Sequence, residues 1–288
     1  MSTCIICNQN TLKFYKSIDN IKIDECRKCQ ICITRDIKKL SNPQIYSDTG
    51  PYLFGNYKTV EQIQRKKFEM FCKTISKYIR KGVFLEVGAG FGLFASILLK
   101  QKGMQIDLLE PNLPLEYIDK NQKKVKVYRF DLDKYLMINK KKYDGIFFID
   151  VLEHFKNPKQ TLTDVSTVLN KDAFIIINLP NYKSIMARIC NNWSWWMIED
   201  HYFHFSPKSI KSLLQLSGFE TIYLRTYETS YDFKKNLDGN FVHIKNKYKR
   251  KIIKLIFFSF FIPFYFLFRD IIWNLGYGGS IFIIAQKT

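Results

Sequence analysis

The stretch LEVGAGFGLF, residues 85–94, joins an apolar run to a glycine-rich turn and the start of an apolar helical pattern. Glycines at 88, 90 and 92 allow positive φ angles and let a ligand approach the backbone closely. The dinucleotide-binding pattern requires glycine or alanine at position 93, where this chain has Leu93. Glu86, two residues before the loop, would repel a pyrophosphate but suits an ammonium group. The loop therefore predicts a ligand that carries an amine.

Strand and helix patterns alternate from residue 83 onward. Short apolar runs predict strands, and apolar residues three and four positions apart predict helices. This alternation predicts an α/β fold, a mostly parallel sheet with helices on both faces and ligands at the carboxyl ends of its strands. The expected strands span residues 83–87, 105–110, 124–130, 143–150, 173–180, 219–227 and 280–287, and the expected helices include 61–79, 92–101 and a stretch ending near 121.

Acidic residues follow the predicted strands at the edge where a ligand should bind. Glu110 ends the second strand, 22 residues after Gly88, where a carboxylate binds ribose hydroxyls. Asp131 and Asp150 follow the third and fourth strands. A ligand that combines an amine, a ribose and an adenine without a phosphate is S-adenosylmethionine (SAM). The pattern therefore points to SAM.

At these residues the chain resembles the class I SAM-dependent methyltransferases, over about residues 60–228 and 280–287. LEVGAGFG is similar to their first motif. IDVLEHFKNP, residues 149–158, is similar to the motif after strand four in the subgroup that includes ubiquinone-type O-methyltransferases. HYFHFSPKSIKSLLQLSGFE, residues 201–220, is similar to the histidine–Phe–Ser segment of that subgroup. The resemblance implies a Rossmann-like, seven-stranded sheet.

The resemblance also implies a cofactor site at the strand ends. Glu86 and the loop backbone would hold the methionine end of SAM, and Glu110 would bind the ribose. Asp131 would meet the adenine amine, and the alternative is an ordinary turn residue at the end of a strand. The full set implied is Glu86, Gly88, Ala89, Gly90, Gly92, Glu110, Pro111, Asp131, Leu132 and Asp150.

Methyl transfer to a hydroxyl requires alignment of the acceptor and removal of its proton. His201 matches the family's histidine and is the preferred general base, His154 is the alternative, and Asp150 would sit near both cofactor and acceptor. His204 is expected to pack. Tryptophans in NNWSWWMIED, residues 191–200, could form an acceptor wall, a core cluster or a membrane-facing cluster. Tyr52 and Tyr57 could form part of a lid, or simply pack.

Two cysteine pairs near the N-terminus have the spacing of a zinc ribbon. Four thiolates fill a tetrahedral shell, so the zinc would be structural. This predicts a ribbon over 1–45, a linker or lid with the N-terminal helix over 46–82, and a SAM domain over 83–288. The predicted ligands are Cys4, Cys7, Cys26 and Cys29, whereas Cys72 and Cys190 are expected to be ordinary buried residues.

A zinc ribbon ahead of a SAM domain is similar to a bacterial group linked to surface-polysaccharide and sugar-nucleotide biosynthesis. Some members methylate sugar carbon and carry a further C-terminal domain, for which this chain is too short. We therefore expect O-methylation of a sugar, glycan or glycolipid precursor. The formal charge of +19 suits an anionic partner, although an AT-rich genome accounts for it equally well. An RNA base methyltransferase and a non-catalytic zinc-ribbon scaffold are the alternatives.

The segment NKYKRKIIKLIFFSFFIPFYFLFRD, residues 246–270, interrupts the last strand pair as part of an insertion at about 236–275. Its uncharged run covers 14 residues, which is short for a membrane span, and it contains Pro263. A strand of the sheet follows, so the chain must leave and re-enter the domain on the same side of any membrane. The segment either lies in a membrane interface or packs, as a buried hairpin or in a dimer. The N-terminus has no secretory pattern, which predicts a cytoplasmic protein, on the inner face of the cytoplasmic membrane if the segment binds lipid.

Overall fold

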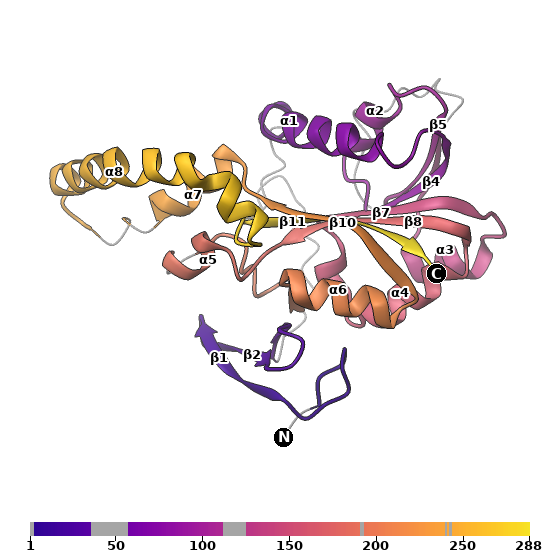
Figure 1. Cartoon of the computed structure of the whole chain (residues 1–288), viewed down its shortest axis with the longest axis horizontal. Coiled ribbons are helices and arrows are strands. Elements are labelled where there is room, and N and C mark those ends of the chain that lie inside the picture. The colour runs from indigo at the N-terminus through magenta and orange to yellow at the C-terminus, as the bar shows by residue number, and fades with distance from the viewer. Residues whose placement is uncertain (1–2, 36–56, 112–124, 191–192, 240, 242–243) are drawn as a thin grey trace.

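The computed structural model describes residues 3–35, 57–111, 125–190, 193–239, 241 and 244–288. Within these ranges the chain forms two sheets, a central one in the order β10-β11-β8-β7-β4-β5-β6 and a smaller one in the order β1-β2-β3-β9 (Figure 1). The central strands are β4 (Gly82–Val87), β5 (Met104–Leu109), β6 (Val125–Tyr128), β7 (Tyr143–Ile149), β8 (Leu169–Pro180), β10 (Phe219–Tyr227) and β11 (Ser280–Lys287).

The central sheet is mostly parallel, as the sequence predicts. Strands β4, β5, β6, β7 and β8 pair in parallel, while β11 lies antiparallel between β8 and β10. The α/β, Rossmann-like, seven-stranded fold is therefore confirmed. β8 begins at Leu169, four residues before the predicted strand, and the helix expected to end near 121 lies outside the described residues.

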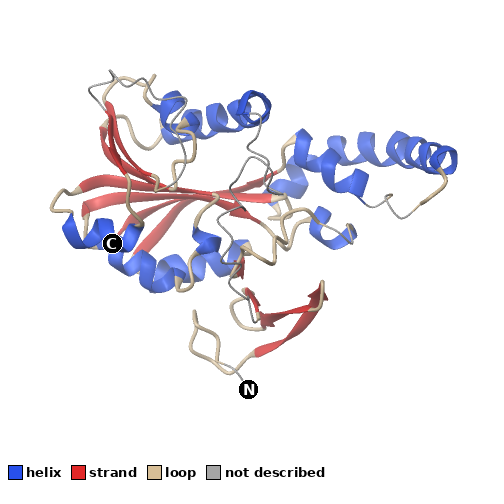
Figure 2. Ribbon diagram, turned by 180° about the vertical axis from the view of Figure 1, so that it is seen from behind, coloured by secondary structure: helices blue, strands red, loops and turns tan. Residues whose placement is uncertain are grey.

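Helices cover both faces of the sheet because successive strand residues point to opposite sides (Figure 2). Phe84 packs in one core cluster and its neighbour Leu85 in the other. The first cluster lies under α1 (Tyr57–Ile75) and α2 (Leu93–Leu98), and the second under α3 (Leu132–Ile138), α4 (Pro158–Ser166) and α6 (Pro207–Leu216).

The small sheet combines the N-terminal cysteine segment with a strand from the opposite half of the chain. It contains β1 (Leu12–Ile18), β2 (Ile21–Cys26), β3 (Cys32–Thr34) and β9 (Phe203–His204), all in antiparallel pairs. Cys32 pairs with His204, and Ile33 with Phe203. The N-terminal sheet is therefore completed by the segment that precedes α6.

A helical hairpin is inserted between β10 and β11. It consists of α7 (Ser230–Gly239) and α8 (Lys247–Asn274), and α8 projects well beyond the sheet in Figures 1 and 2. In the described part of the chain, α8 is the one helix long and apolar enough to cross a membrane. Pro263 does not interrupt it: the helix continues through that residue. Short α5 (Ile185–Ile189) lies near the root of the hairpin.

Candidate functional site

Four parallel strands end side by side at one edge of the central sheet. Val87 at the end of β4 aligns with Leu109 at the end of β5, and Leu109 aligns with Tyr128 at the end of β6. On the other side of β4, Val87 aligns with Phe148, the second-last residue of β7. Glu86 lies one residue before the end of β4, and the other residues expected to bind the cofactor follow these strand ends. Parallel pairing therefore brings the predicted set to one edge.

The loop after β4 has the backbone that the glycine spacing predicts. Gly88, Gly90 and Gly92 have φ angles of +68°, +54° and +80°. A Cβ added to Gly88 would lie 2.7 Å from Val151 Cγ2, so packing excludes a side chain there. A Cβ on Gly90 would meet no described atom within 4 Å. Gly90 therefore leaves space for a ligand, whereas Gly88 and buried Ala89 pack against the protein.

Two buried carboxyl groups adjoin this loop. Glu86 is 2% exposed, and its Oε2 makes no hydrogen bond within the described residues. Burial, and next the charge of Glu110, raises the pKa of Glu86 well above its usual value. Glu110 Oε2 accepts a hydrogen bond of 2.8 Å from the Gly90 N–H. A cationic group beside Glu86 would give its orphaned oxygen a hydrogen-bond partner and offset the cost of burying the ionised carboxylate.

Asp150 stands at the end of β7 in a left-handed conformation, with φ of +57°. Its Oδ2 lies 2.9 Å from Lys67 Nζ on α1, and its Oδ1 accepts a hydrogen bond from the Asn178 side chain. Asn178 in turn accepts a hydrogen bond of 2.7 Å from Tyr227 OH. Strained backbone that is held by such a network is typical of functional sites.

The sequence did not single out Lys67, Asn178 or Tyr227 as site residues. Lys67 is buried on α1, and the only local hint is a charged residue one position before apolar Phe68 on that helix. Asn178 is the polar residue in AFIIINLP, residues 173–180, the otherwise apolar second part of β8. A buried polar residue inside an apolar strand is the signal that could have found it.

The remaining predicted cofactor residues lie at the same edge with different surroundings. Asp131 is the N-cap of α3, where its Oδ1 accepts a hydrogen bond of 2.8 Å from Lys134 N. This is the turn role that the sequence left open beside adenine binding. Leu132 is buried, and Pro111 is exposed directly after Glu110.

The two candidate bases pack against each other. The rings of His154 and His201 are 4.7 Å apart between centroids, in an edge-to-face arrangement. His201 is 1% exposed, with Nδ1 3.2 Å from the Trp195 carbonyl and Nε2 without a partner in the described chain. His154 Nδ1 lies 3.1 Å from Asp200 Oδ2 and close to buried Glu153.

These surroundings give the two histidines opposite protonation states. Burial, together with the charge of His154, lowers the pKa of His201 well below its usual value. Burial also acts to lower the pKa of His154, but Asp200 and Glu153 outweigh it and raise the value to about 9. At neutral pH His201 is therefore neutral, and His154 is protonated.

Comparison with known proteins agrees with this geometry. Residues 61–224, more than half of the chain, match the methyltransferase-domain family. The chain belongs to this family. Comparison with curated protein sequences finds no significant match.

Solved structures with the same fold include several SAM-dependent methyltransferases. A possible histamine N-methyltransferase from Thermotoga maritima is 15% identical, with a TM-score of 0.53 over 81% of this chain and 95% of that one. A SAM-dependent methyltransferase from Archaeoglobus fulgidus is 21% identical, with a TM-score of 0.51 over 81% and 100%. The 1,6-didemethyltoxoflavin-N1-methyltransferase of Burkholderia thailandensis is 12% identical, with a TM-score of 0.50 over 96% and 99%. At these identities the likeness shows the fold.

The cysteines of the methyltransferase gather as the spacing predicts. One sulfur from each of Cys4, Cys7, Cys26 and Cys29 lies within 4.8 Å of all the others, and the Cys4–Cys29 and Cys7–Cys26 distances are both 3.6 Å. Four thiols on two turns form a donor set that fits tetrahedral zinc. Cys72 and Cys190 are buried, as expected.

The small sheet is fixed to the methyltransferase domain beside the histidines. Thr34 Oγ1 donates a hydrogen bond of 2.8 Å to the His201 carbonyl and lies 2.9 Å from His204 Nε2. Burial lowers the pKa of His204 to about 3, which fits the packing role expected for it. The N-terminal segment therefore supports the loop that carries His201.

The tryptophans take part in this contact. Trp193 and Trp196 are 1% and 3% exposed, in a cluster with residues of β2, β3 and α7. Trp196 packs on Tyr15 of β1 and on His204, with centroids 6.2 Å and 4.9 Å away. Of the three alternatives, the structure supports a core cluster for these two side chains.

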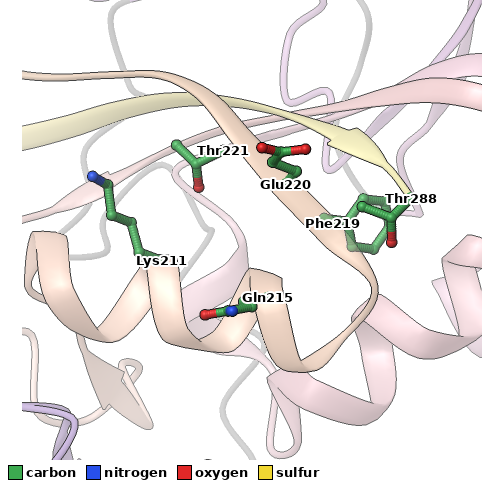
Figure 3. A pocket seen from close by; sticks show the side chains of 6 residues that line it. All are labelled: Lys211, Gln215, Phe219, Glu220, Thr221 and Thr288. Carbon is green, nitrogen blue, oxygen red and sulfur yellow. The ribbon is translucent and has the colours of Figure 1, made fainter.

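A surface hollow of about 430 Å³ lies at the other edge of the sheet (Figure 3). It is formed by α6, the first residues of β10 and the C-terminal Thr288. Because β10 starts there, this hollow lies away from the strand ends that carry the glycine loop. The hollow does not belong to the candidate cofactor site. Tyr52 of the predicted lid lies outside the described residues.

Proposed function

We propose that this methyltransferase binds SAM at the ends of β4 and β5 and methylates a hydroxyl of a sugar, glycan or glycolipid precursor. The observation that carries SAM binding is the buried Glu86 carboxyl with an orphaned oxygen, next to the open space over Gly90. The ammonium group of SAM would satisfy that oxygen. When bound, SAM supplies an electrophilic methyl group, and the protein supplies alignment.

The other loops would complete the site. Glu110 would bind the ribose diol, and its Oε2 is already oriented by the Gly90 N–H. Asp131 and Leu132 would flank the adenine, with Asp131 also capping α3. Asp150, held by Lys67 and Asn178, would stand between cofactor and acceptor.

We propose His201 as the general base, because a neutral imidazole can accept a proton and a protonated His154 cannot. Its ring is buried, so an acceptor can reach Nε2 only after the segment around 195–204 moves. That segment is fixed to the N-terminal sheet through Thr34. We further propose that Cys4, Cys7, Cys26 and Cys29 hold one structural zinc, which would stabilise this support.

The acceptor class rests on the resemblance to ribbon-bearing enzymes of surface-polysaccharide biosynthesis. The decisive experiment is incubation of the purified protein with isotopically labelled SAM and an extract of the source cell, followed by mass spectrometry of the product. A labelled O-methyl sugar or glycolipid supports the proposal. Label in RNA instead would favour the base methyltransferase, and no SAM binding by calorimetry would favour the scaffold.

A further inference from the structure

Helix α8 presents an apolar stripe to the exterior. Its exposed apolar side chains recur at spacings of three and four residues, which places them on one face of the helix. Among them, Phe260 is 77% exposed and Leu267 76% exposed. The stripe consists of Ile252, Ile256, Phe260, Phe264, Leu267 and Ile271. This is a larger apolar surface than a soluble domain usually exposes without a partner.

The opposite face of α8 is held by the domain, so the stripe has a fixed direction. Phe261 stacks on Phe233 of α7 with centroids 6.1 Å apart, and Tyr265 lies 4.3 Å from the same ring. Tyr265 is buried, and its hydroxyl donates a hydrogen bond of 3.2 Å to Glu228. These contacts prevent the helix from turning its stripe inward.

The start of α8 is strongly basic. Within the described residues, no carboxylate pairs with the cations of the first turns, whereas Lys254 pairs with Asp238 at 2.7 Å. This basic segment consists of Lys245, Lys247, Lys249, Arg250 and Lys251. Because the whole chain carries +19, a second copy would be repelled, and an anionic surface would be attracted.

The dimensions of the helix decide how it would meet a bilayer. The uncharged run from Leu255 to Phe268 is 14 residues, about 21 Å at 1.5 Å per residue, and a bilayer core is about 30 Å thick. Arg269 and Asp270 follow directly, and β11 then returns to the sheet between β10 and β8. A crossing helix would therefore place charged side chains in the bilayer core and separate β11 from its sheet, whereas a helix that lies flat on the membrane does neither.

We propose that α8 lies in the interface of an anionic phospholipid bilayer, with the stripe among the acyl chains and the basic segment on the headgroups. The hairpin leaves the sheet after Tyr227 and returns at Ser280, which are paired beside the ends of the parallel strands. The bilayer therefore lies on the side of the cofactor loops. Lipid binding itself does not depend on methyl transfer.

The test is flotation of the full chain with vesicles of phosphatidylcholine alone or mixed with phosphatidylglycerol. We expect binding to the anionic vesicles only, and weakening as salt is raised. Replacing Ile256, Phe260, Phe264 and Leu267 by serine should weaken binding at least about a hundredfold. The matched control replaces four exposed apolar residues elsewhere and should leave binding unchanged: Val127, Met137, Ile138 and Leu216.

A second pair of variants tests the charges. Replacing Lys245, Lys249 and Lys251 by glutamine should weaken binding about fivefold per lysine, whereas the control at Lys126, Lys171 and Lys211 should not. Unchanged thermal unfolding shows that each variant is folded. If the protein does not bind anionic vesicles at low salt, the proposal is overturned. It is also overturned if sedimentation shows a dimer that the serine variant abolishes. Vesicle binding without SAM binding would leave it standing and would count only against the proposed function.

Discussion

Replacing Gly90 by valine should remove SAM binding from a protein that still folds. Gly90 has a φ of +54°, and a residue with a Cβ in the left-handed region costs about 1–2 kcal/mol. Its Cβ would meet no described atom within 4 Å, so we expect no steric penalty on top of this backbone cost. For a chain of this size that lowers the melting temperature by about 2–4 °C per kcal/mol.

The effect on the ligand should be much larger than the effect on the fold. The new side chain would occupy the space into which the loop lets SAM approach, and would displace it from Glu86 and Glu110. Because each lost hydrogen bond to a charged group costs about 1.5–3 kcal/mol, and 1.4 kcal/mol is about tenfold in affinity, losing both carboxylates should raise the dissociation constant at least about a hundredfold. Isothermal titration calorimetry with SAM measures it directly.

Gly218→Val is the matched control for the backbone. Gly218 has a φ of +81°, and its Cβ would come no nearer than 4.0 Å to Thr288 Oγ1. It follows α6, at the other edge of the sheet. We expect a similar loss of melting temperature and unchanged SAM affinity. Unchanged affinity in a folded Gly90→Val protein would refute the placement of SAM over this loop.

Three further predictions address the carboxyl group, the metal and the base. Because burial raises the pKa of Glu86, SAM binding should release a proton from this carboxyl group, and SAM affinity should increase as the pH rises above about 4.5 towards the raised pKa. Calorimetry on Glu86→Gln should show that this pH dependence is lost. A wild-type affinity that does not depend on pH would contradict the prediction. Elemental analysis of protein purified without chelator should find one zinc per chain. The Cys26→Ser variant should lose this zinc, and its small sheet should unfold before the SAM domain does. Protein with intact thiols but no zinc would count against the metal site. His201→Gln should slow turnover by roughly 10²–10⁴-fold with little change in SAM affinity, and if His154→Gln alone behaves in this way the two roles are reversed.

The sequence predicted the features that depend on neighbouring residues. Strand and helix periods predicted the parallel sheet, because a buried face repeats every two or every 3.6 residues. The spacing of Gly88, Gly90 and Gly92 predicted three left-handed residues, because only glycine adopts that conformation at little cost. The double Cys-x2-Cys spacing likewise predicted that four thiols meet, because each pair is brought together by its own short turn.

Tertiary structure alone decided the features that join distant segments. Nothing local in Phe203 and His204 marks a strand, because a two-residue strand exists only when β3 supplies its partner. The Lys67–Asp150 pair joins α1 to β7, and the burial of His201 depends on how its loop packs between the N-terminal sheet and His154. The orientation of α8 is of the same kind. Its sequence is apolar nearly all round, and the contact of Tyr265 with α7 selects which face stays outside, because a helix has no preferred face until a neighbour covers one.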